Sequence, residues 1–210
     1  ELIRRALVRG YKAIGVTDHV GLGNVEYVVK TLVVDCANAT ERWDILAMPG
    51  VEITHVPKDD IDMLARTAKE LGAKLVTVHG ETIVEPVEPG TNEAAVRSAF
   101  VDVLAHPGLI SYEVARLAAE NGVYLEVSAR KGHSLTNGHV VNLARQVGAA
   151  TVLDSDAHEP DDLLTLDLID KIAEGAGLNK EEAHALLETN PQNLLVKLGF
   201  GPVPASDSSL

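Results

Sequence analysis

Apolar runs along this chain alternate with amphipathic stretches, and several of the apolar runs end on a residue that can bind a metal ion. These ends are, in order, His19, Glu52, His79, His106, Glu126 and Asp156. They follow one another at intervals of 20 to 33 residues, about the length of one strand plus one helix. Strands that alternate with helices predict a parallel sheet, and a row of polar strand ends favours a barrel-type α/β fold. We therefore expect these polar groups to gather at one end of a sheet or barrel.

The same pattern predicts six strands and a helix after each of them. We expect strands over residues 13–17, 45–53, 74–79, 101–106, 124–128 and 151–155, and helices over 1–9, 26–43, 59–71, 91–100, 111–121, 136–147, 161–174, 180–188 and 191–198. Glycines that stop a helix follow several of these segments, for example Gly72 and Gly122. Thr91 is a plausible helix cap, and Pro49 indicates a bend or an edge position in the second strand.

Length and composition restrict the kind of protein. The 210 residues fit one domain over residues 1–200, followed by a tail, 201–210, that we expect to be disordered. A single cysteine, Cys36, excludes an intrachain disulfide and suits a reducing compartment. No apolar run has the length of a membrane span, and the first residues lack the apolar stretch of a signal peptide. We expect a cytoplasmic protein with no membrane partner.

The charge of the chain affects which partners are favoured. The formal net charge is −13, whereas nucleic-acid binding depends on Lys and Arg to neutralise phosphates. Nucleic acid is therefore not expected as a partner. Bound divalent cations would reverse the sign locally, so that a small phosphorylated substrate could still bind.

The segment AspSerAspAlaHis158 is the sharpest motif. In an extended chain, residues two apart point to the same side, so Asp156 and His158 can reach one metal ion together. A carboxylate beside an imidazole suits zinc, manganese or iron. Asp154 is expected to face the other way or to support the loop. The alternative is a polar turn that caps the next helix.

The other strand ends add candidates of the same kind. His79 and His106 each end an apolar run in successive strand-helix units, and Glu52 is a carboxylate among apolar neighbours that would be costly without a cation. ThrAspHis19 offers His19 as a ligand, with Asp18 as the group that positions it. Glu126 remains open, because it is as compatible with a structural carboxylate as with a ligand.

In this order and spacing, ThrAspHis19, GlyValGlu52, ValHis79, AlaHisPro107 and SerAspAlaHis158 resemble the PHP family, named for polymerase and histidinol phosphatase domains. The resemblance runs from about Ala13 to Phe200. It implies a distorted, TIM-like (β/α)7 barrel that binds two or three divalent ions, zinc, manganese or iron, and hydrolyses phosphate esters. It also implies the metal ligands, which are His19, Glu52, His79, His106, Asp156 and His158, with Glu52 as a bridging carboxylate.

The sequence departs from the family pattern at its start. The family begins with a strand that carries a His-x-His pair, and this chain has no histidine before His19. His133 and His139 follow the sixth family strand and lie too far along the chain to replace the pair. We therefore expect the first barrel strand to be missing. Because the chain begins with Glu1 and not Met, a longer parent protein is favoured over a natural variant with a reduced site.

The resemblance also suggests a mechanism if the site is complete. Two close cations would provide a metal-activated hydroxide and bind the phosphate oxygens. Arg130 and Lys131, directly after the strand 124–128, are the candidates for binding the substrate phosphate, and His133 is placed to protonate the leaving alkoxide. Glu81 is a weaker substrate-binding candidate. Alternatively, Arg130 and Lys131 are solvated surface charges.

The predicted function is the metal-dependent hydrolysis of a small phosphomonoester, as in the histidinol phosphatase-like branch of the family. A phosphodiesterase or exonuclease is an alternative that the acidic charge disfavours. The absent His-x-His pair favours another alternative, a catalytically impaired metal-binding or interaction domain. A metal-dependent amidohydrolase also uses strand-end ligands, but its usual carbamylated or bridging lysine has no evident counterpart here.

Overall fold

A six-stranded parallel sheet organises the computed structural model, which describes residues 1–204. Its strands are β1 (Ala13–Val20), β2 (Leu46–Ile53), β3 (Leu75–His79), β4 (Val103–Ala105), β5 (Tyr124–Ser128) and β6 (Thr151–Asp154). Each strand pairs in parallel with the next one along the chain, in the order β1-β2-β3-β4-β5-β6. The predicted parallel α/β architecture is confirmed.

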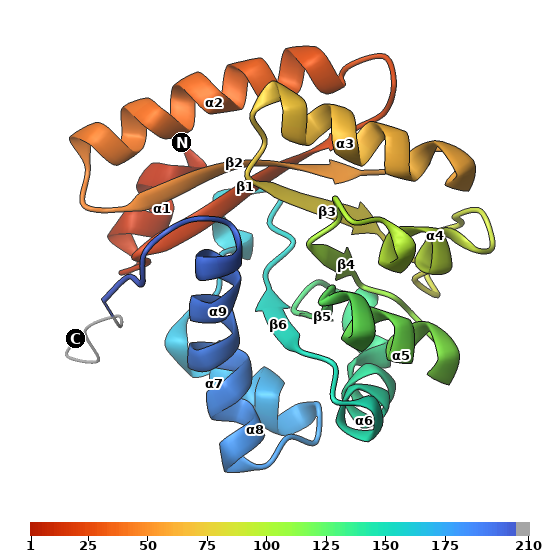
Figure 1. Ribbon diagram of the computed structural model, residues 1–210. Helices are drawn as coiled ribbons and strands as arrows, with labels where there is room; N and C mark the ends of the chain where they lie inside the picture. The colour runs from red at the N-terminus through yellow and green to blue at the C-terminus, as the bar shows by residue number, and fades with distance from the viewer. Residues whose placement is uncertain (205–210) are drawn as a thin grey trace.

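Helices lie around the sheet, and those between two strands pack on its outer side (Figure 1). They are α1 (Leu2–Val8), α2 (Val25–Arg42), α3 (Ile61–Leu71), α4 (Thr91–Arg97), α5 (Tyr112–Asn121), α6 (Asn137–Val147), α7 (Leu166–Gly175), α8 (Lys180–His184) and α9 (Asn190–Lys197). Short turns lie between them: the 3₁₀ turns η1 (Lys58–Asp60), η2 (His133–Thr136) and η3 (Pro160–Asp162), and the π-helical turn η4 (Ala185–Thr189). None of the helices within residues 1–204 has both the length and the apolarity needed to cross a membrane.

The sheet curls into a half-barrel whose two edge strands, β1 and β6, do not pair with each other (Figure 1). The part of the chain from α7 to α9 lies beside β6. The seven-stranded barrel implied by the resemblance is therefore present only as six strands in the described residues. Residues 205–210, most of the tail predicted to be disordered, lie outside these residues.

The local signals for helix ends are largely confirmed. Gly72 and Gly122 both adopt a left-handed conformation directly after a helix, with φ of 113° and 65°. Thr91 is not the cap of α4, because Gly90 occupies the cap position with φ of 96° and Thr91 is the first helical residue. The hydroxyl of Thr91 instead donates a hydrogen bond to the carbonyl of Glu88.

The expectation of an edge position at Pro49 is wrong. Pro49 lies within β2, an internal strand paired with both β1 and β3, where its Cα partner is Val16. The missing N–H removes one possible bond to a neighbouring strand. The carbonyl of Pro49 still accepts a hydrogen bond of 2.7 Å from the backbone N–H of Lys74, so the strand pairs on both sides.

The main hydrophobic core lies between the sheet and the helices that cover it. Its fully buried members include Val51, Leu64, Val76, Leu104 and Leu125. Each buried aliphatic side chain of this size contributes roughly 1.5 to 3 kcal/mol relative to an exposed one. This packing fixes the strands, and with them the positions of the polar residues at their carboxyl ends.

Candidate metal centre

Six of the eight histidines of the chain form one cluster at the carboxyl edge of the sheet; they are His19, His55, His79, His106, His133 and His158. The rings of His106 and His133 stack, with centroids 4.1 Å apart, and the ring of His79 stands edge-on to His106 at 4.3 Å. His19 and His158 form a second edge-on pair at 5.6 Å. Strand ends that are far apart in the sequence thus place their imidazoles side by side.

Strand register explains how these residues meet. In the ladder between β1 and β2, His19 is the partner of Glu52, and its Nε2 lies 3.6 Å from Glu52 Oε2. In the ladder between β3 and β4, His79 is the partner of Ala105, which directly precedes His106. Because all strands are parallel, their last residues share one edge, as the sequence pattern predicts.

Glu52 and His106 form the buried centre of the cluster. Glu52 Oε1 and His106 Nε2 are 3.7 Å apart, and neither atom has a hydrogen-bond partner within residues 1–204. Burial, and then the nearby Asp156 and Glu126, raise the pKa of Glu52 well above its usual value. Burial lowers the pKa of His106 to about 4. A neutral imidazole and a carboxylate that point at each other without a partner fit a divalent cation between them.

Glu126, which the sequence left open, supports His106. Its Oε2 accepts a hydrogen bond of 2.8 Å from the backbone N–H of His106 and lies 3.2 Å from Nδ1 of the same residue. The carboxylate therefore orients the ring so that Nε2 faces Glu52. Burial raises the pKa of Glu126, and its Oε1 has no partner in the described part of the chain.

The loop after β6 contributes Asp156 and His158. Asp156 adopts a left-handed backbone conformation, with φ of 47°, and its Oδ2 lies 3.7 Å from Nε2 of His133. His158 lies beside His19 and is half-exposed; its backbone N–H donates to Asp162 Oδ2 at 2.9 Å. The motif AspSerAspAlaHis158 thus brings Asp156 and His158 to the same cluster.

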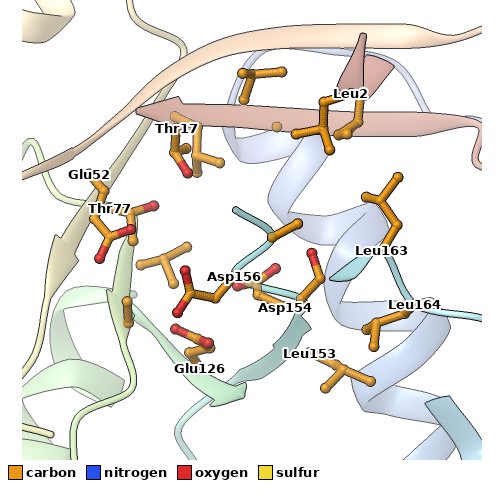
Figure 2. A pocket seen from close by; sticks show the side chains of 18 of the residues that line it. Leu2, Thr17, Glu52, Thr77, Glu126, Leu153, Asp154, Asp156, Leu163 and Leu164 are labelled. Carbon is orange, nitrogen blue, oxygen red and sulfur yellow. The ribbon is translucent and has the colours of Figure 1, made fainter. Parts of the chain in front are cut away.

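All six predicted metal ligands, His19, Glu52, His79, His106, Asp156 and His158, therefore lie at the same edge of the sheet. Asp154 does not only support the loop, because its side chain lines the same cavity as Asp156 (Figure 2). Desolvation, together with the charges of Glu126 and Asp156, raises the pKa of Asp154. The structure thus places more carboxylates in the site than the strand-end pattern predicts.

The three predicted substrate-binding residues, Arg130, Lys131 and Glu81, differ in burial and in hydrogen bonding. Arg130 is half-buried and donates to the backbone carbonyl of Asp156 at 3.0 Å, while Lys131 is exposed. Glu81 accepts hydrogen bonds from the N–H groups of Gly90 and Asn92, which links its carboxylate to the start of α4. Their roles in substrate binding stay predictions.

Of the two predicted catalytic residues, His133 lies within the histidine cluster. It is buried, its Nδ1 lies 2.7 Å from the hydroxyl of Thr82, and burial together with His106 lowers its pKa to about 4. Asp18 is exposed and, like His19, is among the residues that line the cavity inside the half-barrel. Both catalytic roles stay predictions.

Sequence reasoning missed two members of the cluster. Glu85, in the loop after β3, has its Oε2 2.9 Å from His79 Nε2. His55 follows β2 and has a ring centroid 5.1 Å from that of His79, with a φ of 52° that is unusual for a residue other than glycine. Both come from irregular segments, where no periodic pattern predicts the direction of a side chain.

A cavity of about 740 Å³ lies inside the half-barrel and reaches the candidate centre. Figure 2 shows Glu52, Glu126, Asp154 and Asp156 on one side of it and Leu153, Leu163 and Leu164 on the other. The lining also includes residues of β1 and of α9, so the cavity fills the region between the two unpaired edge strands. The cavity is therefore polar at the carboxyl ends of the strands and apolar near the gap between the unpaired edge strands β1 and β6.

Comparison with known sequences gives a relative that covers nearly the whole chain. Uncharacterized protein MJ1295 of Methanocaldococcus jannaschii is 42% identical over 199 residues, which are 94% of this chain and 91% of that protein. The chain belongs to the MJ1295 family. No model of a described protein family matches the chain.

More distant relatives of this MJ1295 family member have functional names. A protein of Shewanella sp. (strain ANA-3) named as a probable phosphatase is 30% identical over 65% of this chain and 58% of its own length. Ribonuclease P protein component 3 of Methanosarcina acetivorans is 30% identical over 57% of this chain and 56% of its own length. The aligned segments thus span less than two thirds of these two proteins.

Solved structures share the fold. A chain in the cryo-EM structure of archaeal ribonuclease P with mature tRNA matches 94% of this MJ1295 family member, with a TM-score of 0.66 and 17% identity. The crystal structure titled "putative histidinol phosphatase hisK" from Listeria monocytogenes matches 77% of it, with a TM-score of 0.56 and 11% identity. At these identities the matches show a shared α/β, TIM-like fold.

Proposed function

We propose that this chain is a metal-dependent phosphoesterase of the PHP type and that it hydrolyses a small phosphomonoester. The observation that carries the proposal is the pair Glu52 and His106, two buried ligand atoms 3.7 Å apart without hydrogen-bond partners in the described residues. The relatives named as phosphatases and the shared fold of the Listeria structure support the same class of reaction.

The proposed ligands fall into two groups around Glu52. His79 and His106 lie on one side of this carboxylate, and His19 and His158 lie on the other, with Asp156 near His133. A carboxylate between two such groups is suited to bridge two ions. Divalent cations held there would supply a water molecule of lowered pKa and positive charge for the phosphate oxygens.

The protein's own residues would position the ester. Arg130 is tied to the loop of Asp156 and lies beside the cluster, so its remaining N–H donors can bind non-bridging phosphate oxygens. The apolar part of the cavity, which includes Leu163 and Leu164, would exclude water from the rest of the substrate. A cavity of about 740 Å³ suits a small organic phosphate better than a polymer.

The gap between the edge strands β1 and β6 leaves room for further metal ligands. We propose that a further strand carrying the His-x-His pair of the PHP family fits between these two edges. It would pair with both and place its histidines at the end of the sheet that carries His19 and Asp156. Without such a strand the chain would hold a reduced set of ligands and a lower activity.

Hydrolysis assays test the proposal. The chelator-treated protein, reloaded with Mn²⁺ or Zn²⁺, is expected to release phosphate from small phosphomonoesters, and an Asp156→Asn variant is expected to lose most of this activity. A diester and a single-stranded RNA serve as competing substrates. The proposal would be contradicted if the folded, metal-loaded protein hydrolysed no phosphate ester, even after a strand with the His-x-His pair had been added to it.

The relative named ribonuclease P protein component 3 favours a second candidate, a domain that assembles with other macromolecules without hydrolysing an ester. The formal charge of −13 argues against direct contact with RNA. Metal-independent, salt-sensitive binding of the chain to RNA, together with no phosphatase activity, would favour this candidate.

A further inference from the structure

The loop between β3 and α4 places a carboxylate against the buried histidines. Glu85 Oε2 lies 2.9 Å from Nε2 of His79, and Glu85 Oε1 lies 3.8 Å from Nε2 of His133. The two oxygens of one carboxylate therefore face two imidazoles from different parts of the chain. Glu85 itself is half-exposed, whereas both histidines are buried.

Hydrogen bonding defines what His79 offers to Glu85. Nδ1 of His79 lies 3.1 Å from the carbonyl oxygen of Gly80, and a carbonyl can only accept, so Nδ1 carries the proton. In the neutral ring, Nε2 then presents a lone pair. The carboxylate of Glu85 also presents lone pairs, so the two groups at 2.9 Å need either a second proton on the His79 ring or a cation between them.

The distance between His79 Nε2 and Glu85 Oε2 is short enough for both atoms to bind a single ion. With metal–ligand bonds of about 2.1 Å, two ligands at octahedral or tetrahedral angles are roughly 3.0 to 3.5 Å apart. The 2.9 Å between His79 Nε2 and Glu85 Oε2 is close to the lower value. Glu85 thus stands where a ligand adjacent to His79 would stand.

Two more imidazoles complete the set. One nitrogen each of His79, His106 and His133 lie within 4.8 Å of one another. His106 Nε2 has no hydrogen-bond partner in the described residues, and Nδ1 of His133 lies 2.7 Å from the Thr82 hydroxyl, which leaves its Nε2 toward Glu85. One nitrogen of each of the three rings therefore lies in a common region.

The loop that carries Glu85 is held at several points. The carboxylate of Glu81 accepts N–H bonds from Gly90 and Asn92, and the carboxylate of Glu88 accepts one from Lys58. The Val84 side chain lies so close to Gly132 that a Cβ at position 132 would be 3.2 Å from it. Neighbouring contacts on both sides thus fix the place of Glu85 over the histidines.

We propose that Glu85 caps a divalent-cation position built from His79, His106 and His133. Because His106 Nε2 also faces Glu52 Oε1, Glu52 belongs to the same position, and the imidazole and carboxylate donors together suit zinc. Apart from Glu52, the position needs only His79 at the end of β3, His106 directly after β4 and the loops after β3 and β5, and it uses His133 as a ligand instead of as a proton donor. It rests on the proposed function for the presence of a metal centre, but adds two ligands to that centre.

Metal titration of variants tests this position. The chelator-treated 210-residue chain, Glu85→Gln, His133→Gln and the control Glu88→Gln would be titrated with Zn²⁺ and with Co²⁺. Bound ions would be counted by metal analysis, and the Co²⁺ absorption spectrum would report the ligands. The control lies in the same loop, and a glutamine there can still accept the backbone N–H bond from Lys58 that helps to hold the loop. Circular dichroism would establish that each variant is folded.

The expected result is that Glu85→Gln and His133→Gln bind one ion fewer, or bind one ion at least 10-fold more weakly, and change the Co²⁺ spectrum, while Glu88→Gln matches the wild type. Glu85→Gln with unchanged stoichiometry, affinity and spectrum would overturn the proposed cap. Unchanged binding by His133→Gln would likewise overturn the ligand set. Wild-type protein that binds no metal would overturn the proposed function as well, so the two failures are distinguishable.

Discussion

Nε2 of His106 lies 3.7 Å from Oε1 of Glu52, and both atoms are buried without a hydrogen-bond partner in residues 1–204. A buried polar atom left unpaired costs about 1 to 3 kcal/mol, and more if it is charged. Two such atoms facing each other are costly in a structural core. Their arrangement is explained if a cation binds between them, and this relationship supports the metal centre more strongly than any single motif.

Replacing Glu52 by Gln is expected to remove metal-dependent stabilisation. A ligand at 100 times its Kd adds about 2.7 kcal/mol to the stability of the folded state, which is roughly 5 to 10 °C in Tm for a chain of this size. The wild type should show such a rise with Mn²⁺ or Zn²⁺, and Glu52→Gln about 2 °C or less. Thermal unfolding with and without chelator measures the difference.

The matched control for this experiment is Glu93→Gln, since Glu93 is an exposed partner of Arg97 on α4. It should keep the full metal response of the wild type. An equal response in Glu52→Gln would contradict the assignment of Glu52.

Replacing Glu126 by Gln tests its role as a positioning residue. The amide can still accept the bond from the backbone N–H of His106, but it no longer orients the ring as a carboxylate does. The loss of such a supporting group typically costs 10- to 100-fold in metal affinity. Calorimetric titration with Zn²⁺ should show this loss with little change in the number of ions. Wild-type affinity in the variant would exclude the role.

The site is predictable where periodicity governs it. His19, Glu52, His79 and His106 each lie within one residue of the carboxyl end of a parallel strand, and these ends share one edge, so the sequence spacing is enough to bring them together. Alternation within the strand 124–128 could not decide whether Glu126 had a partner, because that partner, His106, belongs to another strand.

Irregular segments account for what the sequence did not predict. Glu85 is placed by loop contacts such as those of Glu81 and Glu88, and His55 by an unusual backbone conformation. Neither produces a periodic signal. For Pro49 the local rule was misleading. Proline lacks the N–H that a central strand needs, which favoured an edge position, but Pro49 lies in β2, an internal strand.

Gly108 is expected to be intolerant of a side chain. Its φ is 64°, and a Cβ there would lie within 2 Å of the carbonyl oxygen of Glu81, in the loop that carries Glu85. Gly122 has nearly the same φ, 65°, with no atom near its Cβ position. Gly122→Ala should cost about 1 kcal/mol from backbone strain alone, and Gly108→Ala at least ~3 kcal/mol. Urea unfolding compares them; equal losses would contradict the close approach.

Cys36 is expected to make the free energy of unfolding fall as the pH rises through the alkaline range. The side chain is fully buried, and burial raises the pKa of the thiol from 9.0 to about 11. Because the folded pKa is raised, the thiol's contribution is complete below pH 9 and is lost as the pH rises through 11. The wild type should lose up to ~3 kcal/mol more than Cys36→Ala over this range. Parallel pH profiles of the two proteins would contradict the shift.

Anomalous diffraction from crystals soaked in Mn²⁺ or Zn²⁺ tests the central claim most directly. The metal centre predicts a strong peak within about 2.5 Å of both Glu52 Oε1 and His106 Nε2. This peak should be absent from crystals of Glu52→Gln treated in the same way. Soaked wild-type crystals without an anomalous peak at these two atoms, or with peaks only at exposed surface histidines, would contradict it.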